Sequence, residues 1–142
     1  MQTFLPYADF TATAKCLDYK RLGKQRVEAY QIHKIVSGER VTGGWINHPA
    51  VLMWHGYEDA LAVYQNIMIN EWISRGYNNN MLYLPIADDY EIPWWIGNDD
   101  LHNSHKSNLL RKDIEYYSQY DWDIDSTLPY YWPVERWELD YA

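Results

Sequence analysis

The sequence predicts an all-α protein: a single compact domain of three main helices joined by long irregular connections. Its 142 residues are enough to bury one hydrophobic core and too few for two independent cores. Apolar residues recur at helical spacing in three separate segments, and no internal repeat or low-complexity linker divides the chain. We therefore expect residues 1–142 to fold as one unit.

A long first helix is predicted over residues 12–37, after an extended N-terminal arm that contains Pro6. Thr11 or Thr13 can cap this helix, because a hydroxyl oxygen accepts a hydrogen bond from the unpaired N–H groups at a helix start. Gly23 lies inside the helix, where a glycine costs about 1 kcal/mol relative to alanine. That cost predicts a kink or a close backbone approach at Gly23.

Two further main helices are predicted downstream. Residues 57–74 form the clearest amphipathic segment of the chain, and a short helix with Pro49 in its first turn precedes them. A third main helix is predicted over about residues 105–117, with Asn103 or Ser104 as its N-cap.

The remaining stretches lack a sustained period. Residues 77–100 form a connection whose length alone favours a functional role. Within it, Trp94 and Trp95 either stack on bases or belong to the core. Residues 120–142 are acidic and aromatic, and we expect them to pack as an irregular wrap.

Cysteine content and hydropathy indicate a cytoplasmic protein. The single cysteine, Cys16, excludes an internal disulfide framework and a cysteine-rich zinc site, and it fits a reducing compartment. No apolar run approaches eighteen residues, and the first residues lack the basic start and apolar stretch of a signal peptide. We expect no membrane association.

Charge is distributed unevenly along the chain. The formal net charge is −8, yet residues 1–40 hold seven Lys and Arg against four Asp and Glu, which is +3. Residues 88–142 hold four against thirteen, which is −9. The positive charge concentrates in residues 17–28, which carry Lys20, Arg21, Lys24 and Arg26. A basic stretch in an acidic protein predicts a local phosphate-contacting face rather than indiscriminate nucleic-acid binding.

Several short segments, in their order and spacing, resemble the pyrimidine dimer DNA glycosylases of the phage endonuclease V type. They are Tyr-Lys-Arg-Leu at 19–22, Val-Ser-Gly-Glu-Arg-Val at 36–41, Ile-Asn-His-Pro at 46–49, Ser-Arg-Gly-Tyr-Asn at 74–78 and Gly-Asn-Asp-Asp-Leu-His at 97–102. An aromatic C-terminal tail continues the likeness, which runs over the whole chain. The resemblance implies an all-α domain of three main helices, with the N-terminal arm packed between them, that binds damaged double-stranded DNA.

The resemblance also implies a nucleophile at the N-terminus. In that family a free N-terminal α-amine attacks the sugar C1′ at the lesion, an imine forms, and β-elimination cuts the strand. Here Gln2 is too large for the usual removal of the preceding methionine, so Met1 is the residue whose amine would act. The alternative is an ordinary frayed terminus.

A carboxylate on the first helix assists this chemistry in the family. Its position falls on Gly23 or Arg21 here, so the nearest replacement is Glu28, with Asp18 behind it. We therefore expect Met1 and Glu28 to be the catalytic residues. Glu28 could instead form a surface ion pair with Lys24, four residues earlier on the helix.

Six side chains are predicted to contact DNA phosphates. Arg26 matches the basic position on the first helix of the family, and the others are Lys20, Arg21, Lys24, His102 and His105. The two histidines could alternatively join His48 or His55 in a metal site, but no complete ligand set has metal-like spacing, and we expect no metal and no other cofactor.

The leading hypothesis is a DNA repair glycosylase with AP-lyase activity that acts as a monomer on damaged pyrimidine sites in duplex DNA. A second hypothesis is a catalytically silent DNA- or protein-binding relative whose acidic C-terminal tail masks the basic face. A third is a histidine-metal hydrolase.

Overall fold

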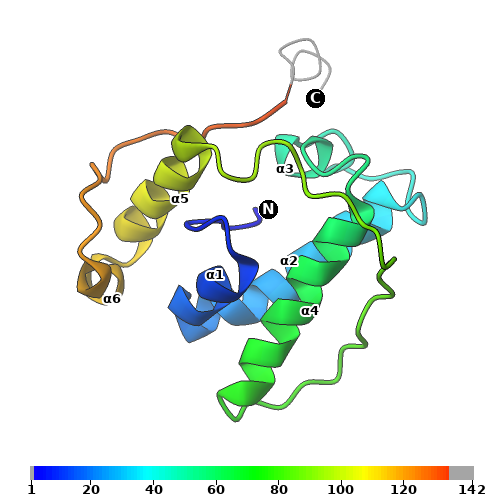
Figure 1. Cartoon of the computed structure of the whole chain (residues 1–142), viewed down its shortest axis with the longest axis horizontal. Coiled ribbons are helices and arrows are strands. Elements are labelled where there is room, and N and C mark those ends of the chain that lie inside the picture. Colours follow the sequence, from blue (N-terminus) through cyan, green and yellow to red (C-terminus); the bar gives the residue numbers. More distant parts are fainter. Residues whose placement is uncertain (1, 135–142) are drawn as a thin grey trace.

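The structure, a computed structural model, describes residues 2–134, and within them it is built from helices without a strand (Figure 1). This confirms the predicted all-α class. The helices are α1 (Phe10–Cys16), α2 (Tyr19–Val36), α3 (Pro49–Leu52), α4 (Glu58–Ser74), α5 (Asp99–Lys112) and α6 (Ile114–Tyr117), followed by the 3-10 turn η1 (Ser118–Tyr120).

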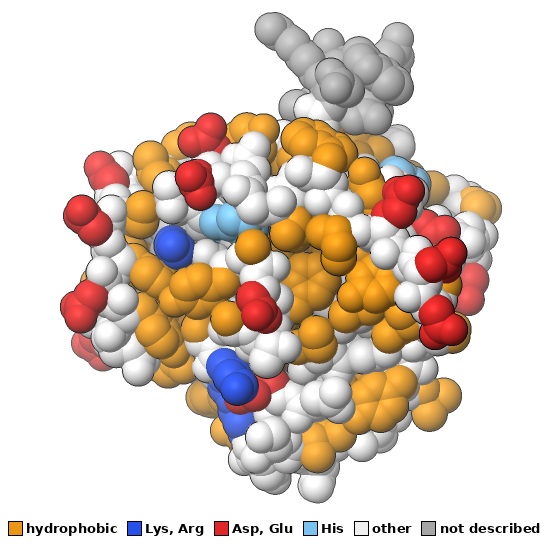
Figure 2. All heavy atoms as spheres, viewed as in Figure 1, with side chains coloured by type: hydrophobic (Ala, Val, Ile, Leu, Met, Phe, Trp, Pro, Cys, Tyr) orange, Lys and Arg blue, Asp and Glu red, His pale blue; other side chains and the backbone are white. Residues whose placement is uncertain are grey.

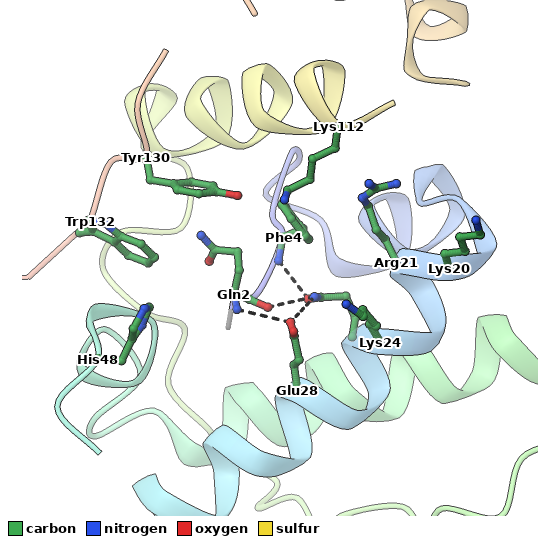
Figure 3. Close-up of a pocket in the computed structure, with 11 residues that line it drawn as sticks. Gln2, Phe4, Lys20, Arg21, Lys24, Glu28, His48, Lys112, Tyr130 and Trp132 are labelled. Carbon is green, nitrogen blue, oxygen red and sulfur yellow. Dashed lines mark hydrogen bonds between the residues drawn. The ribbon is translucent and has the colours of Figure 1, made fainter. Parts of the chain in front are cut away.

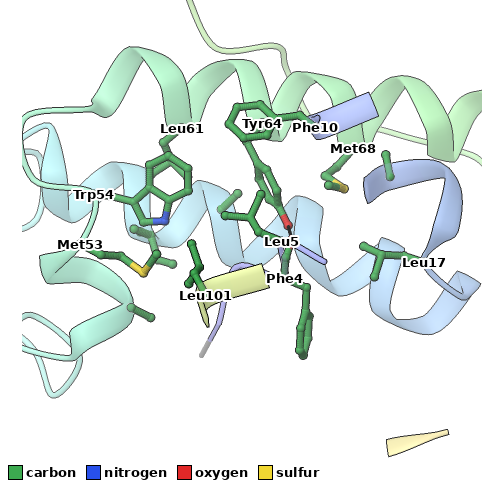
Figure 4. Close-up of a cluster of buried hydrophobic side chains, with 14 of the residues drawn as sticks. Phe4, Leu5, Phe10, Leu17, Met53, Trp54, Leu61, Tyr64, Met68 and Leu101 are labelled. Carbon is green, nitrogen blue, oxygen red and sulfur yellow. Dashed lines mark hydrogen bonds between the residues drawn. The ribbon is translucent and has the colours of Figure 1, made fainter. Parts of the chain in front are cut away.

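Helices α2, α4 and α5 are the three long ones, and α2 packs along α4. The N-terminal arm, residues 2–9, runs between this pair and α5 (Figure 1). Leu5 of the arm is fully buried and lies near Trp54, Tyr64 and Leu101 in the core (Figure 4). The arm is therefore a structural part of the core, as the resemblance implied.

The predicted first helix is two helices, and they are separated at Leu17 and Asp18 instead of bending at Gly23. The chain leaves the helix at Leu17 and Asp18, which both have extended backbone angles. Asp9 rather than a threonine caps α1: its carboxylate accepts from the N–H groups of residues 11 and 12. The hydroxyl of Thr13 donates to the Tyr7 carbonyl instead.

Helix α2 continues through Gly23, and helix α4 comes close to α2 at this residue. A Cβ atom on Gly23 would stand 3.0 Å from Cζ3 of Trp72 on α4, which is tighter than nine in ten real Cβ contacts. The glycine therefore permits a close approach of α4, and the contacting group is a side chain rather than backbone. The amphipathic segment predicted over residues 57–74 is confirmed as α4, Glu58–Ser74.

The predicted limits of the third main helix are wrong by about one and a half turns. Helix α5 begins at Asp99 because the Asn98 side chain accepts from the N–H groups of residues 100 and 101. It ends at Lys112, where the non-helical backbone of Asp113 separates it from α6. His102 and His105 consequently lie inside a helix and not at its start.

After η1 the described chain has no helix over residues 121–134, and it returns along α5 (Figure 1). The hydroxyl of Ser107 accepts from the N–H of Leu128, and that of Ser104 accepts from the N–H of Tyr131. These contacts agree with the predicted irregular wrap and bring its aromatic residues beside the arm.

The surface reflects the acidic composition. Figure 2 shows hydrophobic side chains gathered over the middle of one face, with Asp and Glu side chains mostly toward its edges. Within residues 2–134, none of the helices combines the length and the apolar character needed to span a bilayer.

Candidate functional site

A cavity of about 590 Å³ lies where the arm, α2, the end of α5 and the C-terminal segment meet (Figure 3). This volume is in the usual range for ligand sites in proteins. We call it the arm cavity; it is lined by Gln2, Phe4, Lys20, Arg21, Lys24, Gln25, Glu28, His48, Lys112, Tyr130 and Trp132. Four of the eight predicted site residues, Lys20, Arg21, Lys24 and Glu28, are among them.

The Glu28 carboxylate is fixed against the start of the arm. Its Oε2 accepts from the backbone nitrogen of Gln2 at 3.3 Å and from Nε2 of Gln25 at 3.0 Å (Figure 3). The expected alternative, an ion pair with Lys24, does not form: the ion pairs of residues 2–134 are Arg21–Asp18 and Arg75–Glu71. A half-buried carboxylate oriented by two donors is set up to interact with a group bound in the cavity.

Gln25 holds the arm in place and was not predicted. Its Nε2 also donates to the Gln2 carbonyl at 2.9 Å, and its Oε1 accepts from the Phe4 N–H at 3.0 Å. The hydroxyl of Tyr64 on α4 lies 2.6 Å from the same Oε1 and 2.8 Å from the Phe4 carbonyl. A sequence signal for this role exists, since Gln25 falls between Leu22 and Ala29 on the buried face of α2.

Positive charge dominates one wall of the arm cavity. Lys20, Arg21 and Lys24 come from the first two turns of α2, and Lys112 from the end of α5 reaches in from the opposite side (Figure 3). Four cations against the single Glu28 carboxylate make the charged lining +3. Such a wall suits phosphate groups of a polyanion.

Arg21 is oriented by a partner behind it. Its Nη1 lies 3.2 Å from Oδ1 of Asp18, and the same oxygen accepts a short hydrogen bond from the Tyr117 hydroxyl. The backbone N–H of Asp18 donates to that hydroxyl as well, at 3.1 Å. Burial and the hydrogen bond to Asp18 raise the pKa of Tyr117 above its ordinary range, so the hydroxyl stays protonated. Its hydrogen bond holds the Asp18 carboxylate in place beside the Arg21 guanidinium.

The other wall of the cavity is aromatic. The rings of Tyr130 and Trp132 are 5.5 Å apart, and His48 meets Trp132 edge-on at 5.6 Å. His48 Nδ1 accepts from the N–H of Ala50, which orients the ring, and burial lowers the pKa of His48. Burial also raises the pKa of the Tyr130 hydroxyl. These neutral, flat groups suit a planar ring.

The predicted nucleophile, Met1, lies outside the described residues. The first described atom next to it is the backbone nitrogen of Gln2, which is the one that donates to Glu28.

Arg26 points away from the arm cavity. Its guanidinium lies 4.3 Å from the centre of the Trp72 ring, and Nη1 donates to Oδ1 of Asn79 at 2.6 Å. The Tyr77 ring stacks on the Trp72 ring, with 4.3 Å between the ring centres. Arg26 thus joins α2 to α4 and to the connection that follows α4, and the cavity lining does not include it.

His102 and His105 are buried and bind the arm. The Nδ1 of His105 accepts from the N–H of Leu5 at 2.7 Å, and the Nδ1 of His102 lies 2.7 Å from the Leu5 carbonyl. His102 Nε2 accepts from the Gly97 N–H at 2.9 Å, so the proton of this neutral ring sits on Nδ1 and is donated to Leu5. Burial lowers the pKa of both, that of His105 to about 3. Both rings are therefore neutral and are occupied by backbone groups instead of a phosphate.

The metal hypothesis gains no support from this arrangement. Residues 2–134 contain no group of three or more His, Cys, Asp or Glu side chains placed to share a metal ion.

The two neighbouring tryptophans lie in different environments: Trp95 is fully buried and donates to the Met53 carbonyl, while Trp94 is 64% exposed.

The acidic residues of the described C-terminal segment face outward. Asp121, Asp123 and Asp125 are exposed, whereas Tyr130 and Trp132 line the cavity. Residues 135–142, which hold the rest of the acidic tail, lie outside the described residues. In the described part, then, the tail contributes aromatic groups to the basic cavity and no carboxylate.

A comparison with protein families found one match, over residues 1–84, to the family described as pyrimidine dimer DNA glycosylase. The matched span contains the arm, α1 to α4, Glu28, His48 and the cations of α2, and it ends before Lys112 and the aromatic wall. The match confirms the resemblance drawn from the sequence. Searches among curated proteins and among solved structures returned no match.

Proposed function

The chain belongs to the pyrimidine dimer DNA glycosylase family, and from this premise we propose that it excises damaged pyrimidine bases from duplex DNA and cleaves the resulting abasic site through an imine on the Met1 amine. The observation that carries the proposal is the Glu28 carboxylate, held at the backbone nitrogen of residue 2 in a cavity with a cationic wall.

The proposed carboxylate is bound to the residue that follows the proposed nucleophile. One residue of extended chain spans at most about 3.6 Å, and the Gln2 nitrogen is 3.3 Å from Glu28 Oε2. In this proposal the Met1 amine acts beside Glu28, one residue before that hydrogen bond. The cations that line the cavity favour the neutral form of an amine, which is the form that attacks carbon.

Each side chain then has one task. The amine attacks C1′ of the lesion sugar, the bond from C1′ to the base breaks, and opening of the sugar ring leaves an imine. Loss of a proton from C2′ expels the 3′ phosphate, which cuts the strand. Glu28 takes up and returns protons at the amine and the sugar, and Lys20, Arg21 and Lys24 hold the phosphates beside the lesion.

Arg26, His102 and His105 have structural tasks in this proposal. Arg26 fixes α2 to α4 through Trp72, and the two histidines hold Leu5 so that the arm delivers its first residue to Glu28.

Borohydride trapping on duplex DNA with one abasic site tests the mechanism. We expect a covalent adduct with the wild-type protein and a trapping rate at least about 100-fold lower with Glu28→Gln, which keeps an acceptor for the Gln2 N–H and removes the base. Lys34→Ala serves as a control, since Lys34 lies at the end of α2 outside the arm cavity. Absence of an adduct, with the Met1 amine shown to be free, would contradict the lyase mechanism.

A further inference from the structure

His48 lines the arm cavity and has no task in the reaction as proposed above. It lies directly before α3, and in Figure 3 its ring extends toward Trp132 and the start of the arm. Lys20 and Lys24 lie on the other side of the cavity in the same view. A polar ring therefore faces the bound ligand from across the cationic wall.

Three contacts hold the His48 ring in one orientation. Its Nδ1 accepts from the N–H of Ala50 at 3.0 Å. The Trp45 ring packs against it with 5.0 Å between ring centres, and the Trp132 ring meets it edge-on at 5.6 Å. The backbone N–H of His48 also donates to the Trp45 carbonyl at 3.0 Å, which fixes the chain before α3. The ring is thus oriented before a ligand binds, so binding does not have to order it.

The bond from Ala50 also decides which ring nitrogen carries the proton. Nδ1 accepts only when it has no proton, so the proton of the neutral ring sits on Nε2. Burial lowers the pKa of His48, which favours the neutral ring at neutral pH. Within residues 2–134 the Nε2–H has no hydrogen-bond partner, and it is not fully enclosed, so a ligand in the cavity can reach it. His48 therefore offers one fixed, uncharged N–H donor.

The cationic wall and this uncharged donor suit oxygens of different kinds. Phosphate oxygens carry their charge before and after the reaction, and the cations of α2 match them. A single uncharged donor binds a neutral oxygen weakly and stabilises it more strongly when negative charge develops there. Opening of the sugar ring creates such an oxygen, because the electron pair of the broken bond between C1′ and O4′ goes to O4′.

We infer that His48 is a further catalytic residue, whose Nε2–H donates a hydrogen bond to the sugar oxygen O4′ while the ring opens. This inference rests on the proposed function and assigns a group to the ring-opening step. The nitrogen bonded to C1′ forms the C=N double bond as the bond between C1′ and O4′ breaks. The proton that this nitrogen loses passes through Glu28 to O4′, which becomes a hydroxyl. His48 keeps its own proton and stabilises O4′ until that transfer is complete.

Two substitutions separate the Nε2 donor from the structural role of His48. In His48→Asn the amide oxygen can replace Nδ1 as the acceptor for the Ala50 N–H, and in His48→Ser the hydroxyl can do so, because both residue types are favoured helix caps. Neither side chain is long enough to put a donor where Nε2 lies. His55→Asn is the matched control, because His55 is an exposed histidine outside the arm cavity.

Two duplexes separate catalysis from binding. One carries an abasic site, whose closed sugar must open before an imine forms. The other carries tetrahydrofuran at that position, which keeps the ring oxygen and cannot form an imine. We expect borohydride trapping on the abasic duplex, at saturating protein, to slow at least about tenfold in both His48 variants. Their affinity for the tetrahydrofuran duplex should stay close to that of the wild type, which also shows that the site is folded. Both quantities should be unchanged in His55→Asn.

The possible outcomes bear on different parts of the mechanism. Trapping at the wild-type rate in both His48 variants would overturn the role of His48 and leave the imine mechanism standing. So would a loss of affinity for the tetrahydrofuran duplex as large as the loss of trapping rate, because His48 would then act in binding alone. A wild-type protein that forms no adduct with the abasic duplex would overturn the proposed function itself.

Discussion

Replacing Gln25 by methionine tests whether the arm is held by the polar network under the cavity. Methionine has a similar unbranched shape, so packing around residue 25 is largely kept while its hydrogen bonds are lost. Gln25 is 1% exposed and bonds to the Phe4 N–H, the Gln2 carbonyl and Glu28. The substitution leaves two buried backbone groups of the arm without a partner.

The expected loss of stability follows from those two groups. An unsatisfied buried backbone donor or acceptor costs about 1–3 kcal/mol, so the free energy of unfolding should fall by roughly 2–6 kcal/mol. This is a large part of the stability of a typical domain, about 5–15 kcal/mol. The Phe4 carbonyl keeps its bond from Tyr64, so its contribution does not add to the loss.

Urea unfolding followed by tryptophan fluorescence measures this change. With a slope of about 1–3 kcal/mol per molar urea, the midpoint of Gln25→Met should fall by on the order of 1–3 M. Gln31→Met, at an exposed position of the same helix, should stay within about 0.5 kcal/mol of the wild type. A loss in Gln25→Met no larger than in Gln31→Met would refute the argument that this network holds the arm.

Three further perturbations separate other parts of the account. Lys24→Ala should make the slope of log affinity for duplex DNA against log salt less negative by about one, because one phosphate contact is lost; an unchanged slope would place Lys24 outside the interface. Burial holds the pKa of His105 at about 3, whereas the pKa of histidine in the unfolded chain is near 6.5. The neutral His105 ring therefore contributes fully to the free energy of unfolding above about pH 6.5, and this contribution is lost as the pH falls toward 3. The free energy of unfolding should drop by up to about 1.4 kcal/mol per pH unit from pH 6 to pH 4, and a pH-independent value would contradict the neutral buried ring. Gly23→Leu should destabilise by about 1–3 kcal/mol despite the better helix propensity of leucine, because a Cβ there already meets Trp72 at 3.0 Å; a stabilised variant would show that α4 can move away.

Local patterns predicted those elements whose limits depend on local forces. The segment over residues 57–74 was found as α4, because its apolar spacing and its glycine stop lie within the helix itself. The break at Asp18 was missed, because the N–H of Asp18 is bound by the hydroxyl of Tyr117, which lies 99 residues further along the chain. The residues around position 18 do not indicate that Tyr117 is the partner.

The candidate site shows the same division. The cations of α2 and Glu28 could be selected from sequence, since charge on one helix is visible in its spacing. The roles of His102 and His105 could not, because their partner is the backbone of Leu5 at the other end of the chain. Tyr130 and Trp132 reach the cavity only through the return of the C-terminal segment along α5.

Identification of the amine that carries the trapped DNA tests the central proposal most directly. Lys20, Lys24 and Lys112 also line the arm cavity and also have primary amines, so a trapped adduct alone does not single out the N-terminus. After borohydride reduction, protease digestion and mass spectrometry of the adduct, we expect the DNA remnant on the peptide that begins with Met1. A remnant on Lys20, Lys24 or Lys112 would contradict the N-terminal mechanism.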